Sequence, residues 1–140
     1  FFPPQKGLDD TYSFGFPQHN NLRAISIEDL GGIVLNIFDN PDEYIGKTVF
    51  AAGDSLKPED YAKVMSEVLN KKVVFNFVPQ EVFAGFGFPG ADDLANMFAF
   101  QQEFLPPPHT DADECRKMYP ELNTFRQWME KNKDKFGFMN

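Results

Sequence analysis

The sequence contains little cysteine, histidine and positive charge, and each shortage excludes a class of protein. A single cysteine, Cys115, excludes an internal disulfide and a site built from several cysteines. The two histidines, His19 and His109, lie far apart in loop-like stretches, and no HxxxH or HExxH spacing predicts a metal site. Thirteen Lys and Arg against 21 Asp and Glu give a formal net charge of −8. Since that charge repels phosphate backbones and anionic lipid, we expect neither nucleic acid nor a membrane surface as a direct partner.

Long hydrophobic runs and the common catalytic motifs are also missing. No apolar run approaches the roughly 18–20 residues of a membrane span, and the first residues do not resemble a signal peptide. The sequence has no GxGxxG after a strand, no GxxxxGK[ST] and no GxSxG. Residues 85–90 (GFGFPG) are glycine-rich, but they follow a helical segment and alternate with Phe. We interpret them as a hinge with packed aromatic rings, with part of a ligand mouth as the alternative.

Several acidic groups and one thiol are candidate chemical sites. The acidic groups all lie at turns or helix starts and are predicted to be capping or surface residues: Asp9 with Asp10, Asp42 with Glu43, Asp92 with Asp93, and Asp111 with Asp113 and Glu114. Cys115 lies beside Arg116 and Lys117, which could lower the pKa of its thiol. An unreactive, half-exposed thiol is the preferred interpretation, and a single Cys suits a reducing, cytoplasmic location with entry to the nucleus left open.

The hydrophobic periodicity predicts an α/β protein with few short strands and several packed helices. With 140 residues the chain fits one domain. Strands are expected at 11–16, 48–52 and 72–78, and helices at 26–39, 58–69, 80–86, 91–104 and 125–135. Residues 109–119, after the Pro106–Pro108 link, are expected to be loop-like or to form one weak turn. The alternation of strands and helices in the first half favours parallel pairing.

The helix at 26–39 carries the most detailed predictions. Ser26 is expected to cap it, and Asp29 to complete a capping box. Gly31 and Gly32 are expected to allow close packing against a neighbouring strand. Its buried face is expected to contain Ile27, Leu30, Val34, Ile37 and Phe38.

Phenylalanine is unusually abundant, with 17 residues in the chain. Eight of them lie between positions 75 and 104, where they either fill a core or line an apolar pocket. The candidate pocket for a substrate or partner consists of Phe83, Phe86, Phe88, Met97 and Phe98.

The order of short motifs resembles the NmrA-like family, atypical relatives of the short-chain dehydrogenases/reductases that include regulators and redox sensors. Residues 87–98 (GFPGADDLANMF) resemble the most distinctive family segment. Residues 24–31 (AISIEDLG) and 57–62 (KPEDYA) are similar to two helix starts of the family, 44–47 (YIGK) precede its next strand, and 122–128 (LNTFRQW) resemble its last helix.

The resemblance implies that residues 1–140 are the C-terminal lobe of a Rossmann-type, NAD(P)-binding protein. The family's GATGxxG turn and its Tyr/Lys-type active-site positions belong to the N-terminal dinucleotide-binding half, which this sequence does not include. No catalytic, cofactor-binding or metal-binding residue therefore carries over. NADP(H) is expected for an intact member but not for this chain alone.

The resemblance leaves three functions open. The leading one is an NADP(H)-sensing regulator, or redox sensor, that acts by binding partners rather than by catalysis. The alternatives are the substrate-binding lobe of an NAD(P)H-dependent oxidoreductase and a free-standing, non-enzymatic binding module. The expected partners are a second copy in a homo-oligomer or the missing half, because the predicted strands leave unpaired edges. A basic protein is a further candidate partner, although the acidic surface also simply favours solubility.

Overall fold

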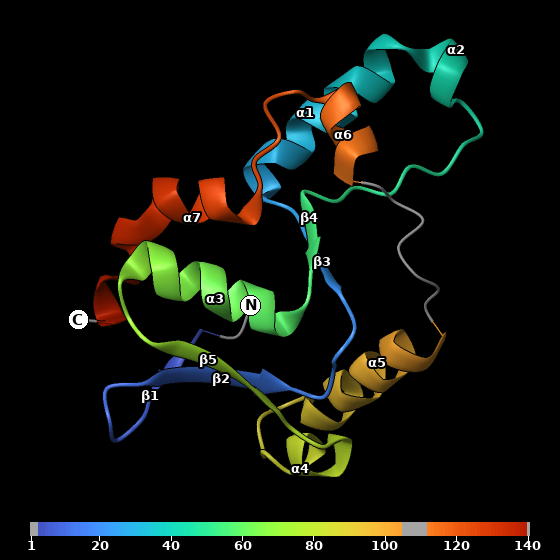
Figure 1. The fold of residues 1–140 in the computed structure, drawn as a ribbon. Coiled ribbons are helices and arrows are strands. Elements are labelled where there is room, and N and C mark those ends of the chain that lie inside the picture. Colours follow the sequence, from blue (N-terminus) through green and yellow to red (C-terminus); the bar gives the residue numbers. More distant parts are fainter. Residues whose placement is uncertain (1–2, 105–111, 140) are drawn as a thin grey trace.

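Short strands and several packed helices alternate along the chain, which confirms the predicted α/β class (Figure 1). The structure is a computed structural model and describes residues 3–104 and 112–139. The strands are β1 Gln5–Lys6, β2 Tyr12–Phe16, β3 Leu22–Ala24, β4 Asp54–Leu56 and β5 Val73–Phe77. The helices are α1 Ile27–Asp39, α2 Pro41–Tyr44, α3 Pro58–Leu69, α4 Gln80–Ala84, α5 Ala91–Phe104, α6 Ala112–Met118 and α7 Phe125–Asn132, followed by a 3-10 helix at Lys133–Met139.

Two small sheets organise these elements. β2 lies between β1 and β5, antiparallel to β1 and parallel to β5, with Tyr12 opposite Val73 and Phe16 opposite Phe77. The predicted parallel pairing is therefore confirmed. β3 and β4 form a separate antiparallel pair, in which Leu22 lies opposite Leu56.

The main core lies where α3 packs between the first sheet and α7. Its buried members are Tyr12, Tyr61, Ala62, Met65, Val73, Met129 and Phe136. The predicted start and end of α3 are both confirmed. Pro58 occupies the first turn, where its missing N–H costs nothing, and Asn70 ends the helix in the left-handed conformation with φ of 50°.

Two smaller cores flank the main one. Phe16, Phe83, Ala95 and Phe98 join the first sheet to α4 and α5. Ile33, Cys115 and Leu122 join α1 to α6 and to the chain that follows it. In Figure 1, α1, α2 and α6 lie together at the top of the molecule, while α4 and α5 lie at the bottom.

The predicted bounds of α1 are nearly those observed, but its predicted buried face is wrong except at Ile37, which is partly buried against the Ile33 core. Ile27 and Phe38 are 86% and 75% exposed, and Leu30 and Val34 are each more than a third exposed. Asp29 and Ile33 are the buried residues of this helix. The physical reason is that α6 and the residues after it cover only a narrow strip of α1.

The contacts at the start of α1 also differ in part from the prediction. Ser26 caps the helix, since its side chain accepts a hydrogen bond from the Glu28 N–H. Asp29 completes no capping box, because its carboxylate accepts hydrogen bonds from Asn123 instead. Gly32 does allow close packing, but against the Tyr119 ring rather than a strand.

Two segments have a different secondary structure from the one expected. Residues 48–52 form no strand, because the antiparallel partner of β3 begins only after Gly53. The segment expected to be a loop contains α6, whose Cys115 packs against α1. The expected half-exposure of Cys115 is wrong as well, since this residue is 1% exposed. His109, Asp111 and the Pro106–Pro108 link lie outside the described residues.

The last helix is shorter than predicted. α7 begins at Phe125, and Thr124 and Gln127 form a capping box in front of it. The α-helix ends at Asn132, and the chain continues as the 3-10 helix. Met129 points inward as expected and is 0% exposed, while Phe125 and Trp128 are partly buried beside it.

Candidate functional site

An apolar cleft of about 930 Å³ lies between β2, α3, α5 and α7. Aromatic rings from all four elements line it: Phe14, Phe16, Tyr61, Phe98, Phe125 and Trp128. The chain from β3 to the start of α1 completes the wall and contributes Arg23 and Glu28. A cleft of this size and lining suits an organic molecule with a large apolar part.

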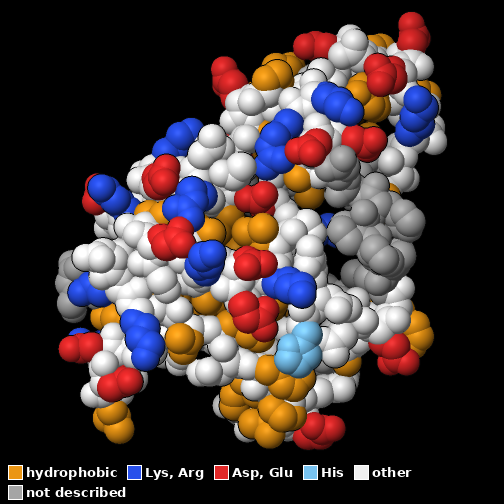
Figure 2. All heavy atoms as spheres, viewed as in Figure 1, with side chains coloured by type: hydrophobic (Ala, Val, Ile, Leu, Met, Phe, Trp, Pro, Cys, Tyr) orange, Lys and Arg blue, Asp and Glu red, His pale blue; other side chains and the backbone are white. Residues whose placement is uncertain are grey.

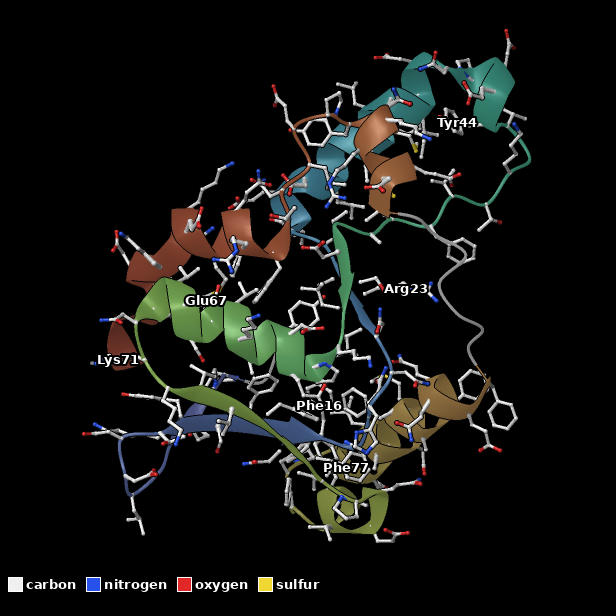
Figure 3. All side chains as sticks on the ribbon, viewed as in Figure 1. Phe16, Arg23, Tyr44, Glu67, Lys71 and Phe77 are labelled. Atoms are coloured by element: carbon white, nitrogen blue, oxygen red, sulfur yellow. The ribbon has the colours of Figure 1, made fainter. Side chains whose placement is uncertain are left out.

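The rings are positioned by the ordinary periodicities of strand and helix. Phe14 and Phe16 are two residues apart on β2, so both point to the same side of the sheet. Their ring centroids lie 5.6 and 5.0 Å from that of Phe75 on the paired strand β5. Phe16 also stacks on Phe98 of α5, at 5.1 Å and an interplanar angle of 12°. The floor of the cleft is therefore a continuous aromatic layer, and Phe16 is labelled within it in Figure 3.

Tyr61 provides a polar group in this apolar wall. Its hydroxyl donates a hydrogen bond to the Leu22 carbonyl oxygen at 3.0 Å. Burial raises the pKa of Tyr61 far above its ordinary value, and the nearby Asp54 carboxylate raises it further. The phenol is therefore neutral at physiological pH, and the hydrogen bond that it donates holds β3 against α3.

A partly buried carboxylate holds the start of α7 in place beside the cleft. Asp54 of β4 accepts a hydrogen bond from the Phe125 N–H at 2.5 Å, at the N-terminus of α7. Arg116 of α6 lies 3.5 Å from the same carboxylate and donates to the Gly53 carbonyl oxygen at 2.6 Å. Because these side chains are already paired with each other, they shape the wall rather than offer a free acid or base.

The five residues predicted for the pocket fall into two groups. Met97 and Phe98 line the cleft. Phe83, Phe86 and Phe88 do not line it, because Phe86 and Phe88 pack on Phe83, with ring centroids 5.4 and 5.8 Å away. Phe98 connects the groups, since its ring lies 5.8 Å from that of Phe83.

The pocket predicted from the sequence does not include most of the residues that line the cleft. Phe14, Tyr61 and Trp128 were expected as strand or helix residues with no link to a site. The sequence pattern indicates only that these three residues lie on apolar faces of separate elements. Periodicity cannot show that those faces meet. The predicted pocket relied on residues close together in the chain, whereas the observed lining comes from both halves of the sequence.

The turns from strand to helix do not fit the pyrophosphate of a dinucleotide. Such a turn needs free backbone N–H groups at a helix start and no competing negative charge. α3 begins with Pro58 and α4 follows Pro79, and neither proline has an N–H. Each first turn also carries acidic residues, Glu28 and Asp29 in α1 being the clearest case. The starts of α1, α3 and α4 therefore do not offer a turn suited to a phosphate group.

The acidic residues at 9–10, 42–43, 92–93 and 113–114 all lie exposed on the surface. A hydrogen bond from the Thr11 N–H lowers the pKa of Asp9, and an ion pair with Lys6 lowers that of Asp10. Within residues 3–104 and 112–139, no group of three His, Cys, Asp or Glu side chains could hold a metal ion. In the same ranges, no helix is both long and apolar enough to cross a membrane.

The comparisons with known proteins agree on one family. The sequence model of the NmrA-like family matches residues 1–129. NmrA-like family domain-containing protein 1 of Rattus norvegicus is 30% identical over 108 residues, which cover 77% of this chain and 53% of the rat protein. An NmrA-like family domain-containing protein of Dictyostelium discoideum is 33% identical over 79 residues, which cover 56% of this chain and 25% of that protein. The chain thus spans a quarter to about half of the length of these relatives.

Among solved structures, the fold is similar to that of NmrA, a negative transcriptional regulator. The NAD complex of NmrA gives a TM-score of 0.75 at 16% identity and covers 97% of this chain and 48% of NmrA. The NADP complex gives 0.72 at 19% identity and covers 91% of this chain and 44% of NmrA. At these identities the likeness concerns the fold.

Proposed function

Because the chain belongs to the NmrA-like family, we propose that it is the C-terminal lobe of a protein that binds NADP(H) and regulates other proteins by binding them. The observation that carries the proposal is the fold it shares with NmrA, which was solved with NAD and with NADP and is described as a negative transcriptional regulator. In this proposal another half of the protein supplies the phosphate-binding turn. The lobe described above supplies the aromatic cleft and the outer surface.

The chemistry of the described residues supports binding rather than catalysis. Two polar groups beside the cleft are used in structural hydrogen bonds, Tyr61 with the Leu22 carbonyl oxygen and Asp54 with the Phe125 N–H. A group that already holds two elements together is a poor general acid or base, because moving its proton would break that contact.

Calorimetric titration of the intact protein with NADP(H) tests the proposal. We expect saturable binding of NADP(H), no steady consumption of NADPH, and no binding by residues 1–140 alone. If the intact protein binds neither NADP(H) nor NAD(H), the sensing role is wrong. An intact mass of 16.0 kDa would instead favour the free-standing module, because no second half would then be present.

The cleft itself favours a second candidate function, the substrate-binding lobe of an NAD(P)H-dependent reductase. Its aromatic lining and its volume of about 930 Å³ would suit an apolar carbonyl compound. Steady NADPH oxidation in the presence of such compounds, reduced by substitution of Phe98 or Trp128, would favour this function over the regulatory one.

A further inference from the structure

Helix α5 carries a second apolar stripe on the side facing away from its buried one. The buried residues of α5 are Ala91, Ala95 and Phe98. Met97, Phe100 and Phe104 follow one another at spacings of three and four, which places them on one face of the helix. They are 39%, 56% and 61% exposed, and we call them the α5 stripe. The rings of Phe100 and Phe104 lie 5.2 Å apart, so the stripe presents a preformed aromatic surface.

The sequence that flanks the α5 stripe is acidic, and Arg23 is a basic residue that lines the same cleft as Met97. No Lys or Arg occurs between Lys72 and Arg116. Asp93 lies one turn before Met97 on the same face, and Glu103 lies directly beside Phe104; both are exposed. Figure 2 shows hydrophobic side chains with some acidic ones and a His over α4 and α5 at the bottom of the view, without Lys or Arg among them.

This combination favours one kind of occupant. Exposed apolar side chains with charges of one sign around them fit a partner that has apolar anchors and the opposite charge. A second copy would place its own acidic α5 against this one, and the like charges would oppose association. An amphipathic helix with Lys and Arg beside its apolar face satisfies both requirements, in the manner of a helix lying in a groove.

The stripe is also continuous with the candidate site, because Met97 belongs to both the stripe and the lining of the cleft. A segment seated on Phe100 and Phe104 would therefore lie at the edge of the cleft. Partner binding and occupancy of the cleft could then influence each other through Met97.

We propose that the α5 stripe docks a cationic amphipathic helix of a partner protein. The apolar side chains of that helix cover Phe100 and Phe104, and its Lys or Arg side chains face Asp93 and Glu103. This inference rests on the proposed function, since it gives a location and a chemistry to partner binding.

A designed Leu/Lys amphipathic helical peptide, labelled with fluorescein, tests the proposal by anisotropy with the intact protein. Two further peptides serve as probes: a scrambled peptide of the same composition and a Leu/Glu peptide of the same pattern. We expect the Leu/Lys peptide to bind, the Leu/Glu peptide not to bind, and the scrambled peptide to bind at least about tenfold more weakly. Binding should also weaken as salt is raised, because exposed charges are screened.

Variants of the stripe make the location falsifiable. The double variant Phe100→Ser and Phe104→Ser should lose at least about tenfold in affinity for the Leu/Lys peptide, and Asp93→Lys with Glu103→Lys should lose as much. The matched control is Leu8→Ser in the turn between β1 and β2, which is fully exposed and distant from α5 in the chain; it should leave binding unchanged. Equal binding by the double Phe variant and the unaltered protein would overturn the proposal. So would a shift from dimer to monomer in that variant, because the occupant would then be a second copy.

The same variants separate this inference from the proposed function. NADP(H) titration of the Phe100/Phe104 variant should match that of the unaltered protein, and near-identical circular dichroism would show that it folds. If NADP(H) binds but no stripe-dependent peptide binding is found, the docking inference fails alone. If NADP(H) does not bind, the proposed function fails whatever the peptide does.

Discussion

Gly32 of α1 is a position at which a single methyl group should matter. A Cβ built on Gly32 would lie 2.5 Å from Cδ2 of the Tyr119 ring, whereas one built on Gly31 would meet nothing within 4 Å. Gly32→Ala should therefore push the ring away and lower the free energy of unfolding by about 1–3 kcal/mol. Gly31→Ala should raise it by up to about 1 kcal/mol, because alanine favours the helix. Urea unfolding of both variants measures the difference, and equal effects would contradict the close contact.

Cys115 should be unreactive in the folded protein. It is 1% exposed, and its Sγ lies 3.4 Å from both the Phe50 carbonyl oxygen and the Ala52 nitrogen. A thiol reagent such as Ellman's reagent can reach it only when α6 separates from α1, so we expect reaction to be slow in buffer and fast in urea. Fast stoichiometric labelling under native conditions would contradict this burial. Complete labelling in denaturant is the control that the thiol is free.

Asp29 connects two helices that are distant in the sequence. Its carboxylate accepts hydrogen bonds from the Asn123 backbone N–H at 3.0 Å and from Asn123 Nδ2 at 2.8 Å. Asn123 precedes α7, so this contact fixes the start of α7 against the start of α1. The cleft is lined next to this contact by Glu28 at the start of α1 and by Asn123 before α7.

Removing this carboxylate should weaken the connection between α1 and α7. Asp29→Ala removes the acceptor of the part-buried Asn123 N–H groups, and we expect a loss of about 1–3 kcal/mol in the free energy of unfolding. The matched control is Glu28→Ala, an exposed acidic residue in the same turn, which should cost at most about 1 kcal/mol through the helix dipole. Thermal or urea unfolding checks both values. A similar loss in the two variants would mean that the Asn123 contact contributes little.

At the scale of the whole molecule, the α1–α2 region and the chain after it expose several large apolar side chains. Leu35, Phe38, Ile45 and Phe50 are all more than half exposed. Residues 1–140 expressed alone should therefore self-associate and bind the dye ANS. The double variant Phe38→Ser and Ile45→Ser should shift the chain toward monomer in sedimentation velocity. A monomer without ANS binding would contradict the expectation that this surface is covered in the intact protein.

The sequence by itself determined the secondary structure wherever one periodicity was strong. α3 and β5 were predicted almost to the residue, because apolar spacing, Pro58 and Asn70 are local signals that act within one element. The same signals indicated the α/β class, and the motif at residues 87–98 indicated the family. Even the weakly amphipathic α5 was placed correctly between its glycines and its last Phe.

The tertiary structure decided which faces are buried and which residues form the site. Ile27 and Phe38 have the spacing of a buried face but lie exposed, because α6 covers only the strip around Ile33. α6 was missed because its burial depends on Cys115 meeting Ile33 across the fold. The cleft was missed for the same reason, since Phe14, Tyr61 and Trp128 come together only when β2, α3 and α7 pack. Local periodicity shows that a helix or strand has an apolar face. Contacts between distant parts of the chain determine which residues of that face are buried.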